Sequence, residues 1–561
     1  MMGMVGKILC AVVIGLCGLQ CANVSTESEY PKPEYPLYGA VFGGKAEVTS
    51  GDLKAIAENF NFVYGQEFSP ADMAATKQIN PDIKFIKYVG IWTSDGYDSE
   101  TRLKRGILYY QTAVLSENIS PTAREFTLKS AQDGQAVELV ASTAEGDISA
   151  YQSTETTSTQ NYVTWIRIGD ELMKIEAFDA ATGRITVTRD FDGQGVSMHT
   201  AGEPVLCPEY GIAPAKSDWR GSTQLKYHYD PASTARWDRA LELLYEFTEN
   251  GGDGLWIDIL GAKSLNEKTI TGEGLYDDAW NFETGKPYLR DEFRAKNEAG
   301  VTYIQEKFSQ RYGRMPIIYG NNLMATRYEV GEAGLRNLLV PTDVKPRAVD
   351  GMCIEDFAGG YDKEQWGRWY ENREVSKPGK ANDAGSYKNW KLNVELVMKA
   401  SQDGLAAIPL IINAGMKTAI FEALSPADRH EWERWAYAMY LMGVERKDGK
   451  CTTMLGTPLF WKDGHEPSDR NARYVSLDEC YYWPVGDPAE TRKPDDLDGY
   501  RKAGGLTYAR NFTNGIVLAN PDETREEVYT LDRAYYDPDT KETVSEITMT
   551  AQTGKILLIV P

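Results

Sequence analysis

The sequence predicts an α/β protein: a (β/α)8 TIM barrel with an inserted small β module and a C-terminal antiparallel β-sandwich. Three observations predict this fold. Short β-rich runs alternate with helical stretches from residue 36 onward, the alternation is interrupted once, and the last part of the chain reads as short strands and turns. The 561 residues suffice for several domains, and 42% hydrophobic with 25% charged residues is typical of a folded chain.

The N-terminus, residues 1–21, has the composition of a secretory signal. Lys7 provides a positive charge and residues 8–19 form an apolar run. As a helix this run rises only about 18 Å, short of the roughly 30 Å hydrocarbon layer, so it does not predict a transmembrane span. Cys21 closes the run before a polar tether, 22–35, which leaves plain secretion and a lipid anchor both open. We expect a secreted protein or a surface or outer-membrane lipoprotein of a bacterium.

The barrel is predicted in two parts, 36–114 and 206–483. Its expected strands are 37–42, 61–64, 84–89, 254–259, 316–320, 351–354, 406–412 and 452–455. Its expected helices include 234–249, 291–312, 387–402 and 426–442. The first strand is followed by Phe-Gly-Gly-Lys, which is not the Gly-rich turn of a dinucleotide-binding fold, so a closed barrel is favoured over a doubly wound sheet.

The interruption, residues 115–205, alternates Thr, Ser, Val and Ile without a helical period. Residues 163–171 read as a hairpin, and residues 185–189 read as a further strand before an Asp-Gly turn. An insertion after the third strand lies on the face where barrel enzymes bind substrate, so it can build or cover a cleft; the alternative is a structural ornament. A Pro- and Asp-rich linker, 484–498, precedes the predicted sandwich, 499–561.

The charge balance restricts the class of partner. With 60 basic and 82 acidic residues the net charge is −22, which disfavours binding to nucleic acids or anionic lipids. Outside the leader the cysteines are far apart and the four histidines show no zinc-site spacing, so no metal and no cofactor are predicted. Free thiols and a Cys451–Cys480 disulfide both remain open for an exported protein.

One short pattern occurs twice. Residues 253–258 and 350–355 both read Asp-Gly, two apolar residues, Ile and a carboxylate. Each is predicted to be a buried strand that ends in an acid, Asp258 in the fourth strand and Glu355 in the sixth. The carboxyl ends of barrel strands meet at the mouth, where barrel enzymes keep their active sites.

Side-chain alternation along a strand gives each acid the direction of the residue two positions before it, Trp256 or Cys353. If those directions face the barrel axis, the two carboxylates converge. Cleavage of a glycosidic bond needs one carboxylate as nucleophile or base and a second as acid. Asp258 fits the first role and Glu355 the second, with Asp356 as an alternative acid; helix capping or ion pairing is the structural explanation of the same acids.

Polar and aromatic residues at predicted strand ends fit a carbohydrate ligand. Amides both donate and accept hydrogen bonds to vicinal hydroxyls, and flat aromatic rings stack on sugar rings. Turn formation and core packing are the alternative explanation for each residue alone. The candidate substrate-binding residues are Glu67, Tyr88, Trp92, His228, Asp230, Trp256, Tyr319, Asn321, Asn322, Trp366 and Asn413.

The two Asp-Gly strand ends and the terminal segments 508–521 and 554–560 resemble the fifteenth "hypothetical glycosyl hydrolase" family of secreted bacterial proteins. The resemblance implies a catalytic barrel and a C-terminal sandwich. Barrels of the α-galactosidase and dextranase type place a nucleophilic Asp after the fourth strand and an acid after the sixth, which by resemblance are Asp258 and Glu355 or Asp356. It implies a hydrolase acting on a polysaccharide or oligosaccharide, with retention of configuration by analogy.

Two other functions fit the same residues. A barrel without catalytic activity could bind carbohydrate at a cell surface, or the inserted module could bind another protein. Fold-level analogy does not distinguish these from a hydrolase.

Overall fold

The structure of the protein is a computed structural model. The residues that it describes are 32–40, 48–64, 68–89, 94–95, 105–131, 137, 165–179, 181–208, 210–212, 225–227, 229–257, 279–320, 349–354, 357, 390–402, 404, 406–410, 426–446, 450–458, 460–461, 473–474, 477–522 and 524–560. The predicted signal segment with Cys21 lies outside them. Among these residues no helix is both long and apolar enough to span a membrane.

The protein is a mixed α/β structure with one large parallel sheet and several antiparallel ones. The eight parallel strands are β1 (Leu37–Ala40), β2 (Phe62–Tyr64), β3 (Lys84–Val89), β13 (Gly254–Ile257), β16 (Ile317–Gly320), β17 (Gly351–Ile354), β18 (Ala406–Pro409) and β19 (Leu455–Pro458). Neighbours in the sheet follow the order of the chain, and β19 pairs with β1. A parallel bridge between Leu410 and Gly456, with a 2.9 Å hydrogen bond from the Met454 N–H to the Ala407 carbonyl, joins β18 to β19. The two ends of the sheet therefore meet.

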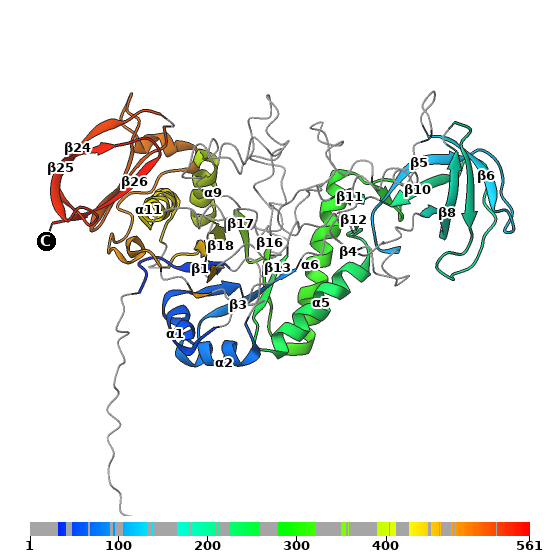
Figure 1. Ribbon diagram of the computed structural model, residues 1–561, viewed down its shortest axis with the longest axis horizontal. Coiled ribbons are helices and arrows are strands. Elements are labelled where there is room, and N and C mark those ends of the chain that lie inside the picture. The colour runs from blue at the N-terminus through cyan, green and yellow to red at the C-terminus, as the bar shows by residue number, and fades with distance from the viewer. Residues whose placement is uncertain are drawn as a thin grey trace, which may run out of the picture.

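Helices cover the outer face of this sheet (Figure 1). They are α1 (Ser50–Asn59), α2 (Pro70–Ile79), α5 (Thr234–Glu249), α6 (Arg290–Tyr312), α9 (Trp390–Gln402) and α11 (Pro426–Gly443). The first two begin with reciprocal capping boxes, Thr49 with Asp52 and Ser69 with Asp72, which satisfy backbone N–H groups that have no partner within the helix. Apolar side chains of the helices and strands form one continuous buried core.

The repeated Asp-Gly pair has the same structural role in both strands. Asp253 precedes β13, and its carboxylate accepts 2.9 Å from the N–H of Phe85 in the neighbouring β3. Asp350 stands one residue before β17, and its carboxylate accepts 2.8 Å from the N–H of Ile318 in the neighbouring β16. A backbone N–H at a buried strand start needs an acceptor, so each acid fixes the register of two adjacent strands.

The interruption after β3 folds as a closed antiparallel barrel of six strands (Figure 1). Its strands are β5 (Tyr109–Leu115), β6 (Glu125–Ser130), β7 (Trp165–Ile168), β8 (Glu171–Asp179), β9 (Arg184–Thr188) and β10 (Pro204–Pro208). Alternate side chains fill its interior with a separate apolar core. The predicted hairpin corresponds to β7 and β8. The bounds 115–205 are too narrow, because β5 and β10 pair along their whole length from Tyr109 to Pro208.

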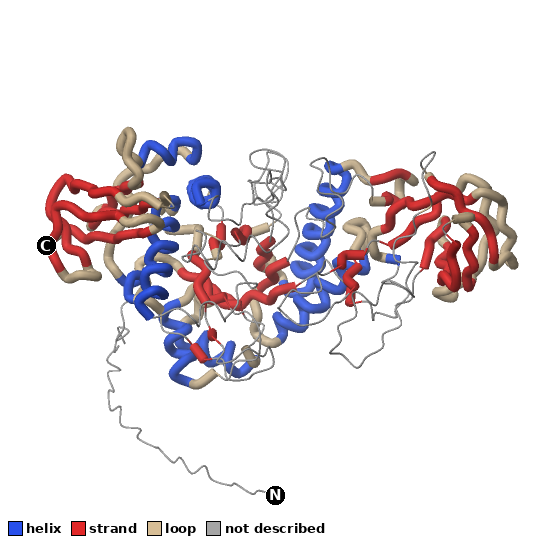
Figure 2. Tube along the Cα trace, turned by 45° about the horizontal axis from the view of Figure 1, so that its top comes forward, coloured by secondary structure: helices blue, strands red, loops and turns tan. Residues whose placement is uncertain are grey.

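The C-terminal region differs from the predicted two-sheet sandwich. It is one antiparallel sheet in the order β22 (Tyr508–Phe512), β23 (Gly515–Asn520), β26 (Thr553–Ile559), β24 (Glu527–Asp537) and β25 (Glu542–Met549). Val517 and Ile556 belong to the main core, whereas Ile516 and Leu557 belong to a core within the sheet itself. Helix α11 packs against β23 and β26, and so provides the layer that a second sheet would provide (Figures 1 and 2).

The predicted linker, 484–498, is also part of this unit. The N–H of Ala489 donates 2.9 Å to the Asn511 carbonyl, and the N–H of Thr513 donates 2.8 Å to the Asp487 carbonyl. The 3-10 helix η7 (Pro494–Tyr500) then leads into β22, and a second one, η6 (Glu479–Tyr482), precedes the segment. The Pro and Asp residues that predict a linker in this segment thus form turns that pack against the sheet.

Short antiparallel pieces complete the described structure. They are β4 (Ser94–Asp95) with β11 (Tyr210–Ile212) and β12 (Leu225–Tyr227), β14 (Trp280–Asn281) with β15 (Lys286–Pro287), and β20 (Phe460–Trp461) with β21 (Arg473–Tyr474). Cys451 and Cys480 are free, so the disulfide alternative is excluded in this structure.

Candidate active site

Three of the predicted binding residues lie side by side in the parallel sheet. Trp256 of β13 is the register partner of Tyr88 in β3 and of Tyr319 in β16. Register partners in a pleated sheet project to the same face. Trp256 and Tyr319 are buried, and Tyr88 is partly exposed.

Ring contacts identify this face as the inner one. The rings of Tyr38 (β1) and Trp256 (β13) are 5.4 Å apart, although two strands separate β1 from β13 in the sheet. Phe62 (β2) and Tyr319 (β16) are 5.8 Å apart across the same number of strands. Side chains of strands so far apart can meet only where the sheet curves around them. Tyr64, next to Tyr88 at 6.1 Å, completes an interior aromatic cluster: Tyr38, Tyr64, Tyr88, Trp256 and Tyr319.

The three remaining strands of the sheet carry small residues on the inner face. Gly351, Ala406 and Gly456 are the register partners that face inward from β17, β18 and β19. A methyl group added at Gly351 would lie 2.4 Å from a ring carbon of Tyr319. The glycine at 351 therefore avoids overlap with the Tyr319 ring on the neighbouring strand.

Two polar atoms of the cluster are buried without a hydrogen-bond partner: the Tyr38 hydroxyl and the Trp256 indole nitrogen. Tyr38 is 0% exposed and Trp256 is 3% exposed. Burial raises the pKa of Tyr38 well above its usual value, and the nearby Tyr64, Cys353 and Tyr319 add to the rise. Tyr38 therefore keeps its proton and can donate it in a hydrogen bond. Tyr38 was not among the residues predicted from the sequence. Its position in the first strand, on the face where Trp256 is expected, is the signal that indicates it.

The strand residues that precede the predicted acids face inward. Trp256 stands two positions before Asp258, and Cys353 stands two positions before Glu355. Cys353 shares its face with Gly351, two positions earlier, and is 1% exposed. The acids themselves lie outside the described residues. So do eight further site candidates: Asp356, Glu67, Trp92, His228, Asn321, Asn322, Trp366 and Asn413.

Asp230 lies apart from the aromatic cluster. It is 5% exposed, and its carboxylate accepts 2.8 Å from the Tyr288 hydroxyl and 2.9 Å from the Ala232 N–H. Burial raises the pKa of Asp230, against the lowering effect of these two hydrogen bonds. Tyr288 and Asp230 each precede a helix, α6 and α5, so the bond joins the two segments that lead into these helices.

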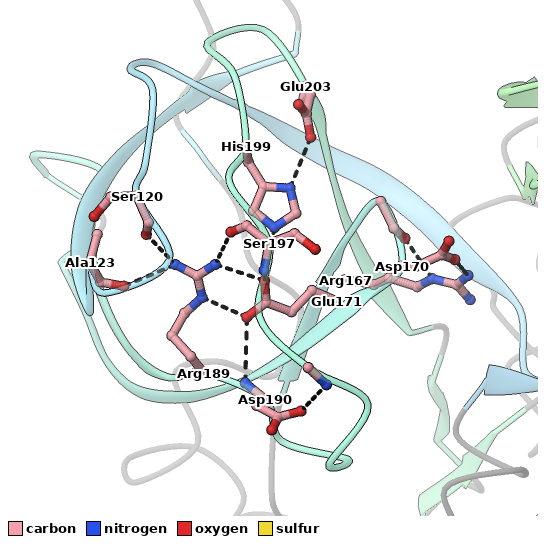
Figure 3. A network of polar contacts seen from close by, with 12 residues as sticks. Ser120, Ala123, Arg167, Asp170, Glu171, Arg189, Asp190, Ser197, His199 and Glu203 are labelled. Carbon is pink, nitrogen blue, oxygen red and sulfur yellow. Dashed lines mark hydrogen bonds and ion pairs between the residues drawn. The ribbon is translucent and has the colours of Figure 1, made fainter.

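A buried polar network in the six-stranded barrel was not predicted (Figure 3). The Arg189 guanidinium donates to both oxygens of Glu171, at 2.6 and 2.7 Å. It also donates to the carbonyls of Ser120, Ala123 and Ser197. His199 contacts Glu171 and Glu203, both at 3.0 Å. Because these charged groups are all paired, the network fixes the loop after β9 and offers no open group for chemistry.

No cluster of metal-ligating side chains occurs among the residues that the structure describes. The described part of the inner face instead presents aromatic rings and two free hydrogen-bond donors. This combination suits a neutral ligand with a flat apolar side and hydroxyl groups.

No family model matches the sequence, and no curated protein matches it. Among solved structures, the chain is similar to the glycoside hydrolase domain of PelA from Pseudomonas aeruginosa, with a TM-score of 0.28 and 10% identity over 76% of this chain and 95% of that chain. Eubacterium rectale Amy13B gives a TM-score of 0.38 and 12% identity over 95% and 97% of the two chains. The trehalose-6-phosphate hydrolase of Bacillus licheniformis gives 0.43 and 8% over 94% and 99%.

Proposed function

We propose that this protein is a glycoside hydrolase that cleaves O-glycosidic bonds in an extracellular polysaccharide or oligosaccharide. Its eight-stranded parallel sheet is then the (β/α)8 barrel that carries the active site at the carboxyl ends of its strands. Chain-order pairing of the strands, helices on the outer face, and the bridge between β18 and β19 support this barrel.

The inward direction of Trp256 and Cys353 is the observation that carries the proposal. Side chains alternate along a strand, so a residue two positions further on the same strand points to the same side. Asp258 and Glu355 occupy those positions in the sequence, one residue beyond the described ends of β13 and β17. We therefore assign Asp258 as nucleophile or base and Glu355 as the acid, with Asp356 as the alternative acid.

The chemistry divides between the two carboxyl groups. The acid protonates the leaving oxygen, while Asp258 attacks the anomeric carbon or activates a water molecule. A separation of about 5–5.5 Å favours retention of configuration, and about 6.5–9.5 Å favours inversion. The aromatic rings beneath would stack on the sugar and limit the access of water.

The test measures reducing ends released from a panel of polysaccharides. We expect activity on at least one of them, with a loss of about 100-fold or more in Asp258→Asn and Glu355→Gln. Asp356→Asn is the matched variant at the neighbouring position. Comparison of its activity with that of Glu355→Gln shows which of the two residues is the acid. Undiminished activity in Asp258→Asn would remove that residue from the mechanism, and glycan binding without turnover would favour a non-catalytic carbohydrate-binding protein.

Export to the bacterial cell surface belongs to the same proposal. If Cys21 carries the lipid, the mature protein partitions into the detergent phase of a cloud-point extraction, because acyl chains hold it there. Cys21→Ser then moves it to the aqueous phase, with Cys17→Ser as the matched control. Aqueous partitioning of the unsubstituted mature protein would instead mean plain secretion.

A further inference from the structure

We propose that Tyr38 and Trp256 form a hydrogen-bonding subsite for a neutral hydroxyl group of the bound sugar. The inference rests on the proposed function in taking a carbohydrate as the ligand. It assigns a specific role to two residues on the inner face of the sheet, one of which was not a sequence candidate.

Both donors are buried without an acceptor. Over nine-tenths of buried polar groups in proteins have a partner, so an orphan donor indicates a missing water molecule or ligand. Here two orphan donors, the Tyr38 hydroxyl and the Trp256 N–H, belong to rings in direct edge contact, 5.4 Å between centroids. The proposed subsite therefore has two donors on side chains that contact each other.

A ligand can reach the two donors from the carboxyl ends of the strands. The exposed fraction of the side chains increases across the interior aromatic cluster: Tyr38 is fully buried, Tyr64 is 8% exposed, and Tyr88 is partly exposed. Trp256 is next to last in β13, near the carboxyl end of the strand. Ligands of parallel α/β proteins enter at that end of the sheet.

The surroundings of the two donors favour an uncharged ligand. The groups whose charge acts on the buried Tyr38 hydroxyl are Tyr64, Cys353 and Tyr319, and none of them is a Lys or an Arg. An anionic group buried here would lack a counter-charge, and the two proposed carboxylates would repel it. Trp256 can only donate, whereas Tyr38 can donate or accept. A neutral hydroxyl matches both, which points to an uncharged sugar.

The experiment measures equilibrium binding by the full chain, without turnover. The probes are the neutral sugars glucose, galactose, mannose, xylose and N-acetylglucosamine, with glucuronate as the anionic counterpart. We expect the unsubstituted protein to bind at least one neutral sugar more tightly than glucuronate. Tyr38→Phe should weaken that binding about tenfold, because one neutral hydrogen bond is lost, and Trp256→Phe should weaken it at least as much.

Tyr437→Phe is the matched control. Tyr437 lies on α11, is 1% exposed and has an unpartnered hydroxyl like that of Tyr38, but it is not in the aromatic cluster. Its substitution should leave sugar affinity unchanged. In both Tyr→Phe variants the melting temperature should stay the same or rise, because an unsatisfied buried hydroxyl is removed.

Each other outcome has a definite meaning. Equal affinity in Tyr38→Phe, or no binding of any neutral sugar, overturns the inference. A lower melting temperature in Tyr38→Phe with unchanged affinity identifies a structural water molecule instead. Tyr38-dependent binding without hydrolysis overturns the hydrolase proposal alone, and hydrolysis that does not depend on Tyr38 overturns this inference alone.

Discussion

At the scale of single residues, the repeated Asp-Gly pattern divides into a structural half and a candidate functional half. Asp253 and Asp350 each fix a neighbouring strand through its backbone N–H, in β3 and β16 respectively. The glycines that follow them allow close contact with β16, because a methyl group at Gly254 would overlap Ile317 and one at Gly351 would overlap Tyr319. The structural half explains why the pattern occurs twice, because the same need recurs wherever a buried strand starts. Trp256 and Cys353 face inward, and the proposed acids follow each of them two positions later in the sequence.

The size of residue 351 gives a first prediction. Gly351→Ala places a methyl group 2.4 Å from Tyr319 and 2.5 Å from the Ala406 carbonyl, so the ring or the strand must shift. We expect a loss of about 1–3 kcal/mol in the free energy of unfolding, measured by urea denaturation. Gly51→Ala in helix α1 is the control, because the atom nearest to the added methyl group would be the Thr49 hydroxyl oxygen, 3.8 Å away. That variant should be neutral or more stable by up to about 1 kcal/mol. Equal effects in both variants would contradict the packing argument.

At the scale of elements, helices and strands could both be predicted where the local pattern is regular: the predicted strands 84–89 and 351–354 have the bounds of β3 and β17. The 3.6-residue period fixes α5 to 234–249, as observed. The last parallel strand was predicted at 452–455 but spans Leu455–Pro458, because it contains Gly456 and Pro458, residues that rarely occur inside strands. Gly456 is needed there, since a side chain would overlap Leu410. Such a requirement depends on a distant segment and leaves no local pattern.

The closure of the six-stranded barrel shows the same limit. Hairpins such as β7 and β8 follow from local alternation, but pairing of β10 with β7 and β5 joins residues far apart in the sequence. The candidate site was partly predictable for the same reason. Alternation gave the direction of Trp256, whereas its ring contact with Tyr38 depends on the curvature of the whole sheet.

The network around Glu171 gives a prediction for this barrel. Burial alone raises the pKa of Glu171, but hydrogen bonds from Arg189, Ser197 and His199 outweigh it and lower the pKa to about 2. This contribution to stability is present above the ordinary value of about 4.5 and is lost as the pH falls through about 2. Glu171→Gln leaves Arg189 buried without its counter-charge, and we expect a cost of about 3–5 kcal/mol.

Hydrogen–deuterium exchange of β7, β8 and β9 in the full chain measures the effect. Protection of these strands should fall in Glu171→Gln at neutral pH. Glu125→Gln is the matched control, because its pair with Arg184 is exposed on the same barrel and is worth at most about 1 kcal/mol. Unchanged protection in Glu171→Gln would mean that the loop after β9 does not depend on the network.

At the scale of the whole molecule, the C-terminal sheet is fixed to the main core by buried charges. Arg510 of β22 is 0% exposed and donates to the carbonyls of Leu441, Met442 and Val444. These carbonyls lie at the end of α11 and have no partner within the helix, so the guanidinium caps it. Figures 1 and 2 show the sheet against this helix, at the opposite end of the molecule from the six-stranded barrel.

His430 of α11 makes this attachment sensitive to alkaline pH. Hydrogen bonds to Asp478, at 2.6 Å, and Asp539, at 2.9 Å, raise the pKa of His430 to about 10. The stabilisation is fully present below the ordinary value of about 6.5 and is lost as the pH rises through about 10. His430→Gln should therefore lower the free energy of unfolding by about 1–3 kcal/mol at pH 7. Between pH 7 and about 10.5, the free energy of unfolding should fall less in this variant than in the unsubstituted protein. Urea denaturation at both pH values tests this, and a parallel decline in the two proteins would exclude His430 as the cause.

The pairing of Tyr109 with Pro208 sets the two ends of the six-stranded barrel beside each other. When a segment has its first and last residues side by side, its deletion leaves only a narrow gap in the chain, and a short turn is enough to join the two ends. Recombination can therefore add, remove or exchange this unit as a cassette while the spacing of the parallel strands on either side stays the same.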